Sequence, residues 1–205
     1  LTPHRCLLLL AQAGPVFWDR SVRGHLELQD PFDERAIAVV EEWLGSMNPQ
    51  PSWQVLYPGP AHLPLGRLAE QVGWGTSSPL GLTIHPEFGL WIAHRVALLT
   101  DQVIEPLEAS MESTAEHPCL SCADTPCVSA CPVGAVSVTT GSDVETCARH
   151  RIDDSSACSH QCLARNACPV GSEHRYGPTQ MRHHYGSGLR SIREWLLPGS
   201  GADEF

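Results

Sequence analysis

The sequence contains no lysine, and all 13 of its basic residues are arginines. The chain therefore has no lysine amine for a Schiff base and no lysine for a Walker-type phosphate loop. Runs of 18 or more apolar residues are also absent, so we expect no membrane-spanning helix. The formal net charge of −10 disfavours nucleic acid and anionic lipid as default partners.

The N-terminal region shows no sign of export. Its longest apolar run, CLLLLAQAG at residues 6–14, is too short to span a membrane and lacks the cleavage-site pattern of a signal peptide. We interpret this run as a buried strand. Since no targeting segment is recognisable, we expect a cytoplasmic protein.

Residues 1–110 have the pattern of a compact α/β unit. Strand-like segments, rich in β-branched and aromatic residues, occur at 5–10, 53–58, 81–84 and 90–99. A first helix is predicted after Asp30-Pro31 and before Gly45. Its inward face would consist of Ala36, Ile37, Val40, Trp43 and Leu44.

A second helix is predicted over residues 62–72, with Gly73 as its C-terminal cap. Its inward residues would be Leu65, Leu68, Ala69 and Val72. Residues 101–116 then resemble an acidic linker, and residues 178–197 one or two helices that end before Pro198. We interpret His183 and His184 as polar residues on the surface of that helical segment.

Residues 117–176 contain few large apolar side chains, and such a segment cannot bury enough apolar area to hold itself together. Eight of the nine cysteines lie here. The first block, CLSCADTPCVSACPVG at 119–134, has the spacing C-x2-C-x4-C-x3-C-P. Bacterial ferredoxins use C-x2-C-x2-C-x3-C-P, in which three cysteines hold one [4Fe–4S] cluster and the fourth ligates the other cluster. The spacing therefore predicts iron–sulfur ligation, with a second gap two residues longer than usual.

The second block, CSHQCLARNACPVG at 158–171, follows the isolated Cys147. If the last cysteine of each block again ligates the cluster of the other block, the eight cysteines form two sets of four thiolates. Cluster I would be held by Cys119, Cys122, Cys127 and Cys168, and cluster II by Cys131, Cys147, Cys158 and Cys162. All eight thiolates are then used, which leaves no open iron position and favours electron transfer. The ninth cysteine, Cys6, is interpreted as a buried residue of a strand.

Other interpretations of the cysteines stay open. Disulfides would need an oxidising compartment, and spacings of two to five residues are too tight for most bridges. Structural zinc usually pairs two CxxC motifs, and only Cys119/Cys122 forms one. One cluster could also be [3Fe–4S], or His150 or His160 could replace a thiolate.

Each oxidised four-thiolate cubane adds roughly two negative charges. Arginines around the second block could offset this charge and so tune the cluster potential. They are Arg149, Arg151, Arg165, Arg175 and Arg182.

Segments ahead of the cysteines carry a family resemblance. They are Gly73-Trp74-Gly75, Leu82-Thr83-Ile84 and Phe88-Gly89-Leu90-Trp91. With the cysteine blocks that follow, residues 62–170 resemble epoxyqueuosine reductase and, more distantly, the corrinoid reductive dehalogenases. The whole chain is also similar to short bacterial ferredoxin-like proteins with two clusters. The first resemblance implies that the first half is related to a cobalamin-binding half, with cobalamin as a further cofactor.

We therefore expect an α+β fold with two parts. Residues 1–110 would form a small α/β unit, like a truncated corrinoid reductase, and residues 111–205 a two-[4Fe–4S] ferredoxin-like domain with C-terminal helices. The expected function is transfer of single electrons to or from a redox partner protein. Two alternatives remain: a cobalamin-dependent reductase or corrinoid-handling protein, and an interaction module stabilised by clusters or zinc. No catalytic residue and no oligomeric state can be assigned from the sequence.

Overall fold

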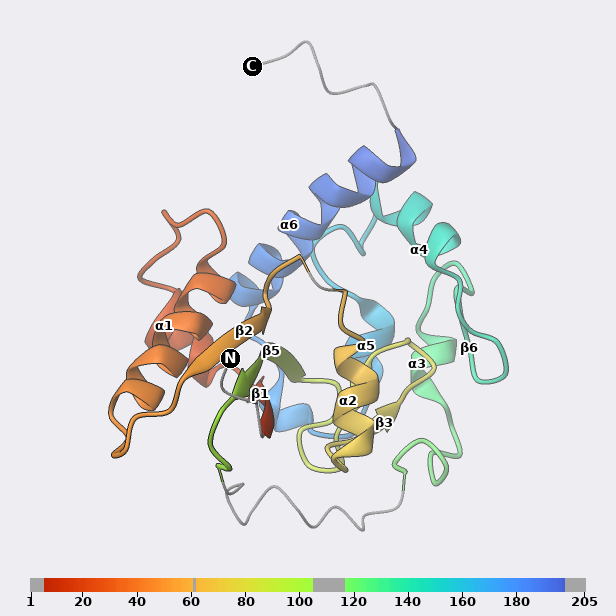
Figure 1. Ribbon diagram of the computed structural model, residues 1–205. Coiled ribbons are helices and arrows are strands. Elements are labelled where there is room, and N and C mark those ends of the chain that lie inside the picture. Colours follow the sequence, from red (N-terminus) through yellow and green to blue (C-terminus); the bar gives the residue numbers. More distant parts are fainter. Residues whose placement is uncertain (1–5, 61, 105–116, 198–205) are drawn as a thin grey trace.

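The computed structural model describes residues 6–60, 62–104 and 117–197, and it confirms an α+β fold with small antiparallel sheets (Figure 1). Most of the expected linker at 101–116 lies outside these residues. Within the described ranges, no helix is both long and apolar enough to cross a membrane. The elements are β1 (Cys6–Ala13), η1 (Trp18–Val22), α1 (Pro31–Gly45), β2 (Trp53–Tyr57), α2 (Leu65–Gln71), β3 (Thr76–Ser77), β4 (Thr83–Ile84), β5 (Ile92–Thr100), α3 (Pro126–Ser129), β6 (Val136–Ser137), β7 (Gly141–Ser142), α4 (Val144–Arg151), α5 (Leu163–Ala167), η3 (Ser172–His174) and α6 (Pro178–Leu196).

The main sheet has the strand order β1-β5-β2, and β5 runs antiparallel to both neighbours. Leu98 at its centre lies opposite Leu8 on one side and Val55 on the other. The strand predicted at 81–84 is shorter than expected, because only β4 pairs there, with β3. Cys6 begins β1 and is half-buried rather than fully buried.

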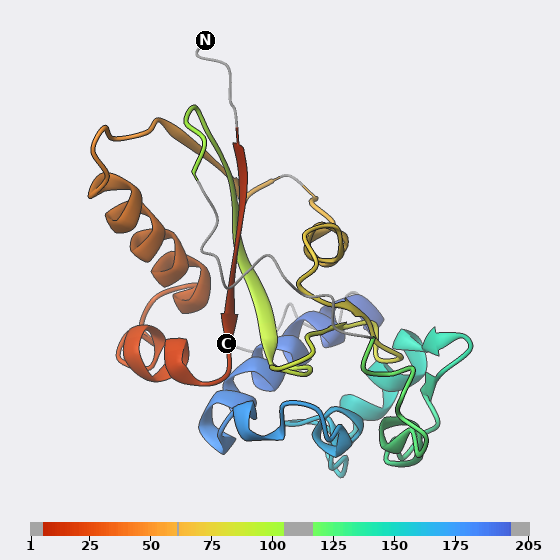
Figure 2. The ribbon, with the colours of Figure 1, turned by 90° about the horizontal axis from the view of Figure 1, so that it is seen from below.

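Helix α1 covers one side of the main sheet, and α2 covers the other (Figure 2). The predicted start of α1 is confirmed, since the Asp30 carboxylate caps the helix by accepting from the backbone N–H of Asp33. Ala36, Val40 and Leu44 recur every fourth residue and are buried in the core. Trp43 was expected on the same face but is 40% exposed, so that part of the prediction is wrong.

Helix α2 is shorter than predicted. It ends at Gln71, and Gly73 then adopts the left-handed conformation expected of a C-terminal cap. Ala69 is buried as predicted. Val72 lies beyond the last helical residue and is 47% exposed, so its predicted inward position is wrong.

The C-terminal segment forms one helix, α6, which crosses the end of the main sheet (Figure 2). Trp91, just before β5, is fully buried and packs with Tyr176 and Met181. His183 and His184 of α6 contact the Phe32 ring, at centroid distances of 5.6 and 4.4 Å. The interpretation of these two histidines as polar surface residues is therefore wrong, because α6 turns them toward the N-terminal part of the fold.

Candidate functional site

Four of the cysteines line one pocket. Cys119, Cys122, Cys127 and Cys168 share its walls, and these are the four ligands expected for cluster I. Among the residues that the structure describes, the remaining walls carry no charged side chain. They are formed by Ser78, Pro79, Leu80, Ile84, Leu90, Pro118, Pro126, Pro169 and Val170. The pocket thus combines four sulfur donors with a largely apolar lining.

Tight turns place the first three of these cysteines. The ring nitrogen Nδ1 of His117 accepts from the backbone N–H of Cys119, and the N–H of Cys122 donates to the carbonyl of Cys119. Thr125 then takes a left-handed conformation, and Pro126 begins the single turn α3 that carries Cys127. The two extra residues in the spacing are thus accommodated in the turn ahead of α3.

Cys168 reaches the same pocket from the end of α5. Its N–H donates to the Arg165 carbonyl, and its own carbonyl accepts from the Arg175 guanidinium. The chain then passes Gly171, whose backbone lies directly against Gly89. This contact fixes the segment that follows Cys168 against the segment 78–90, which provides the apolar wall. The sequence analysis did not foresee the role of that wall.

The other four cysteines form a second group. Burial chiefly raises the pKa of Cys147, and the nearby thiols of Cys162, Cys131 and Cys158 raise it further. Cys147 lies on α4, Cys162 caps the N-terminus of α5, and Cys158 is buried in the loop between these helices. Cys131, Cys158 and Cys162 are thus near enough to Cys147 to affect its pKa, and these four are the residues expected for cluster II.

Backbone N–H groups point at the sulfurs of this second group. Ala135 N–H lies 3.3 Å from Cys131 Sγ, and Arg165 N–H lies 3.4 Å from Cys162 Sγ. Hydrogen bonds to ligating sulfurs stabilise the thiolate and tune the potential of a bound cluster.

Burial raises the pKa of several of these thiols. It raises the pKa of Cys119 to about 11, with further contributions from Cys168, Cys127 and Cys122. Burial also raises the pKa of Cys127 and Cys168. Without a cation these groups would hold their protons at neutral pH, whereas a coordinating metal deprotonates a thiol outright.

Two observations bear on the other interpretations of the cysteines, disulfides and zinc. All nine cysteines are free thiols, so none is used in a disulfide. Over residues 6–60, 62–104 and 117–197, no three His, Cys, Asp or Glu side chains form a group that could hold a metal ion.

Three of the five arginines expected to offset cluster charge lie near the sulfur groups. Arg151 acts electrostatically on Cys147, Arg165 on Cys162, and Arg175 on Cys168. The other two point elsewhere. Arg149 pairs with Glu145 on the surface of α4, and Arg182 is exposed.

No protein-family model matches the chain, and comparisons with curated proteins and with solved structures also find no match.

Proposed function

We propose that the protein carries two [4Fe–4S] clusters and passes single electrons to or from a redox partner protein. The observation that carries this proposal is the pocket that gathers Cys119, Cys122, Cys127 and Cys168. Cys168 is 41 residues beyond Cys127 in the sequence, yet its thiol faces the same apolar space. This return of the last cysteine to the first group is the crossing typical of two-cluster ferredoxins.

The use of all eight cysteines supports electron transfer over catalysis at a cluster. Bound clusters of this kind gain and lose single electrons. If each iron has a protein thiolate, none has a free position for a substrate. Leu120, between Cys119 and Cys122, is 78% exposed, which places the cluster I loop at the protein surface. A partner protein could therefore approach this pocket closely.

The proposal is tested by anaerobic reconstitution, followed by iron and sulfide analysis and by EPR before and after dithionite. We expect about eight irons and eight sulfides per chain and a spin-coupled signal in the reduced sample. Zinc without sulfide would contradict the proposal. Clusters that dithionite cannot reduce would favour an interaction module without a redox role.

The same sample separates electron transfer from the cobalamin alternative. Adding cobalamin to the reduced protein should leave the EPR spectrum of an electron carrier unchanged. A new cobalt(II) signal, with a shifted corrinoid absorption spectrum, would instead support a corrinoid reductase.

A further inference from the structure

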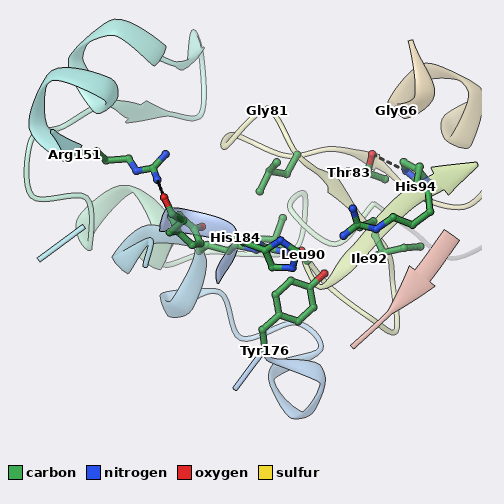
Figure 3. A pocket seen from close by; sticks show the side chains of 14 residues that line it. Gly66, Gly81, Thr83, Leu90, Ile92, His94, Arg151, Tyr176 and His184 are labelled. Carbon is green, nitrogen blue, oxygen red and sulfur yellow. Dashed lines mark hydrogen bonds between the residues drawn. The ribbon is translucent and has the colours of Figure 1, made fainter. Parts of the chain in front are cut away.

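A second cavity of about 440 Å³ lies between β5 and the helices α4, α5 and α6. Figure 3 shows Arg151 at one end and His94 at the other, with His184 and Tyr176 between them. No cysteine of the described residues lines this cavity, so it is distinct from the pocket of Cys119, Cys122, Cys127 and Cys168. Its walls are formed by Gly66, Gly81, Leu82, Thr83, Leu90, Ile92, Ala93, His94, Arg95, Arg151, Arg165, Tyr176, His184 and Tyr185.

The charged residues of this lining all have one sign. Arg95, Arg151 and Arg165 contribute three guanidinium groups, and no Asp or Glu of the described part of the chain lines the cavity. Among the described residues, no carboxylate lies within ion-pair distance of these three arginines. Three cations in one cavity without an anionic partner are costly unless something supplies negative charge.

Aromatic rings hold the guanidinium groups in place. Arg95 lies over the Phe32 ring at 4.4 Å from its centroid, and Arg151 lies over Tyr185 at 4.9 Å. Arg165 lies over Trp91 at 4.4 Å. Stacked guanidinium groups are well ordered before any ligand arrives, which lowers the entropic cost of binding.

Several polar atoms around the cavity have no partner. The buried atoms without a hydrogen bond include Arg151 Nε, Arg165 Nε, His94 Nδ1, His184 Nε2 and the Tyr176 hydroxyl. Native structures rarely leave such groups unpaired, because an unmade buried hydrogen bond is costly. Each of these atoms is buried in this structure, so a ligand with several acceptor oxygens would pair with the donors among them after small movements of the side chains that cover them.

The negative charge of bound clusters would compensate only two of the three arginines. Arg151 and Arg165 act on the Cys147 and Cys162 thiols, but Arg95 acts on none of the cysteines. The side-chain carbonyl of Gln12 accepts from the Arg95 guanidinium, but this amide carries no charge. Asp33 and Asp30 act on Arg95 electrostatically, but among the described residues neither lies within ion-pair distance, so Arg95 is a buried cation without a paired carboxylate.

We infer that this cavity binds a small organic anion, with a carboxylate or phosphate group held by the arginines and an apolar body against Leu82, Leu90 and Ile92. The volume is at the smaller end of the range for ligand pockets, which suits a compact molecule rather than a corrinoid. Guanidinium groups and neutral donors recognise both oxyanions. This inference does not rest on electron transfer by the clusters.

The test is calorimetric titration of the anaerobically prepared protein with benzoate, phenyl phosphate and benzamide. Benzamide has nearly the shape of benzoate but no charge. We expect one of the two anions to bind saturably at one site, with an affinity at least roughly tenfold above that of benzamide. Preference for benzoate or for phenyl phosphate identifies the oxyanion. Failure of both anions to bind, or equal binding of benzamide, would overturn the inference.

Matched variants locate the site. Arg151→Gln and Arg149→Gln change the same residue type on the same helix, but only Arg151 lines the cavity. Arg151→Gln should weaken anion binding roughly tenfold or more, while Arg149→Gln should leave it unchanged. If Arg151→Gln does not fold, Tyr176→Phe keeps the ring and removes only the unpartnered hydroxyl, and it should also weaken binding. Unchanged binding in the folded cavity variants would refute the assignment.

Discussion

Gly89 and Gly171 lie with their backbones in direct contact, and neither has room for a side chain. A Cβ on Gly171 would overlap the carbonyl of Phe88, and a Cβ on Gly89 would overlap the carbonyl of Val170. Both glycines also have positive φ angles, of 56° and 63°. This contact joins the apolar wall of the cluster I pocket to the segment that follows Cys168.

Gly171→Ala should therefore displace Cys168 and reduce the occupancy of cluster I. We expect the free energy of unfolding to fall by about 3 kcal/mol, because overpacking and an unfavourable φ act together. Thermal unfolding and iron content after reconstitution measure the two effects. Gly177→Ala is the control, since a Cβ there meets nothing within 4 Å. Equal iron content in both variants would contradict this role of the contact.

Single cysteine substitutions test how the eight ligands are divided. Cys131 is only four residues from Cys127, but it acts electrostatically on Cys147. Cys131→Ser and Cys147→Ser should therefore remove the same EPR signal, and Cys127→Ser the other one. Cys6→Ser should leave both signals intact, because Cys6 lies on β1. If Cys131→Ser and Cys127→Ser affected the same signal, the crossing would be wrong.

Leu44→Ala and Trp43→Ala compare two neighbours on α1. Leu44 is fully buried in the core, so its truncation should lower the free energy of unfolding by about 2–5 kcal/mol. Trp43 is partly exposed, and its truncation should cost about 1 kcal/mol or less. Chemical denaturation measures both values, and iron content should not change in either variant. Similar losses would mean that Trp43 contributes to the core.

These examples show which features a sequence can predict. The start of α1 was predictable because Asp30-Pro31 acts on its own turn. The spacing of the cysteines predicts two sets of ligands, but the return of Cys168 to the pocket of Cys119 depends on the tertiary fold. The exposure of Trp43 could not be predicted from the sequence, because it depends on where α1 meets the sheet. The arginine cavity was also missed, because Arg95 and Arg165 are brought together only by tertiary packing.

Acid should destabilise the fold partly through His184. Burial, followed by the charges of Arg95, His183 and Arg165, lowers the pKa of His184 from 6.5 to about 3. Between pH 6.5 and about pH 3, His184 therefore binds a proton in the unfolded chain but not in the folded protein. This contribution to stability is present in full above pH 6.5 and is lost as the pH falls toward 3.

His184→Gln should flatten that dependence by up to about 1.4 kcal/mol per pH unit, the effect of one proton. Denaturation between pH 7 and pH 5, compared with the parent protein, gives the difference in slope. Arg149→Gln serves as a surface control and should follow the parent curve. Parallel curves for His184→Gln and the parent would show that this histidine does not carry the effect.

An anion in the arginine cavity should lower the potential of cluster II, a prediction that rests on both proposals. The same guanidinium groups of Arg151 and Arg165 act on Cys147 and Cys162 and line the cavity. Negative charge placed there opposes the gain of an electron by the nearby cluster. EPR-monitored redox titration with whichever of benzoate or phenyl phosphate binds should therefore shift cluster II to lower potential, and cluster I less. Benzamide, or Arg151→Gln with that anion, should abolish the shift. Calorimetric binding without any shift would mean that the cavity and cluster II are electrostatically independent.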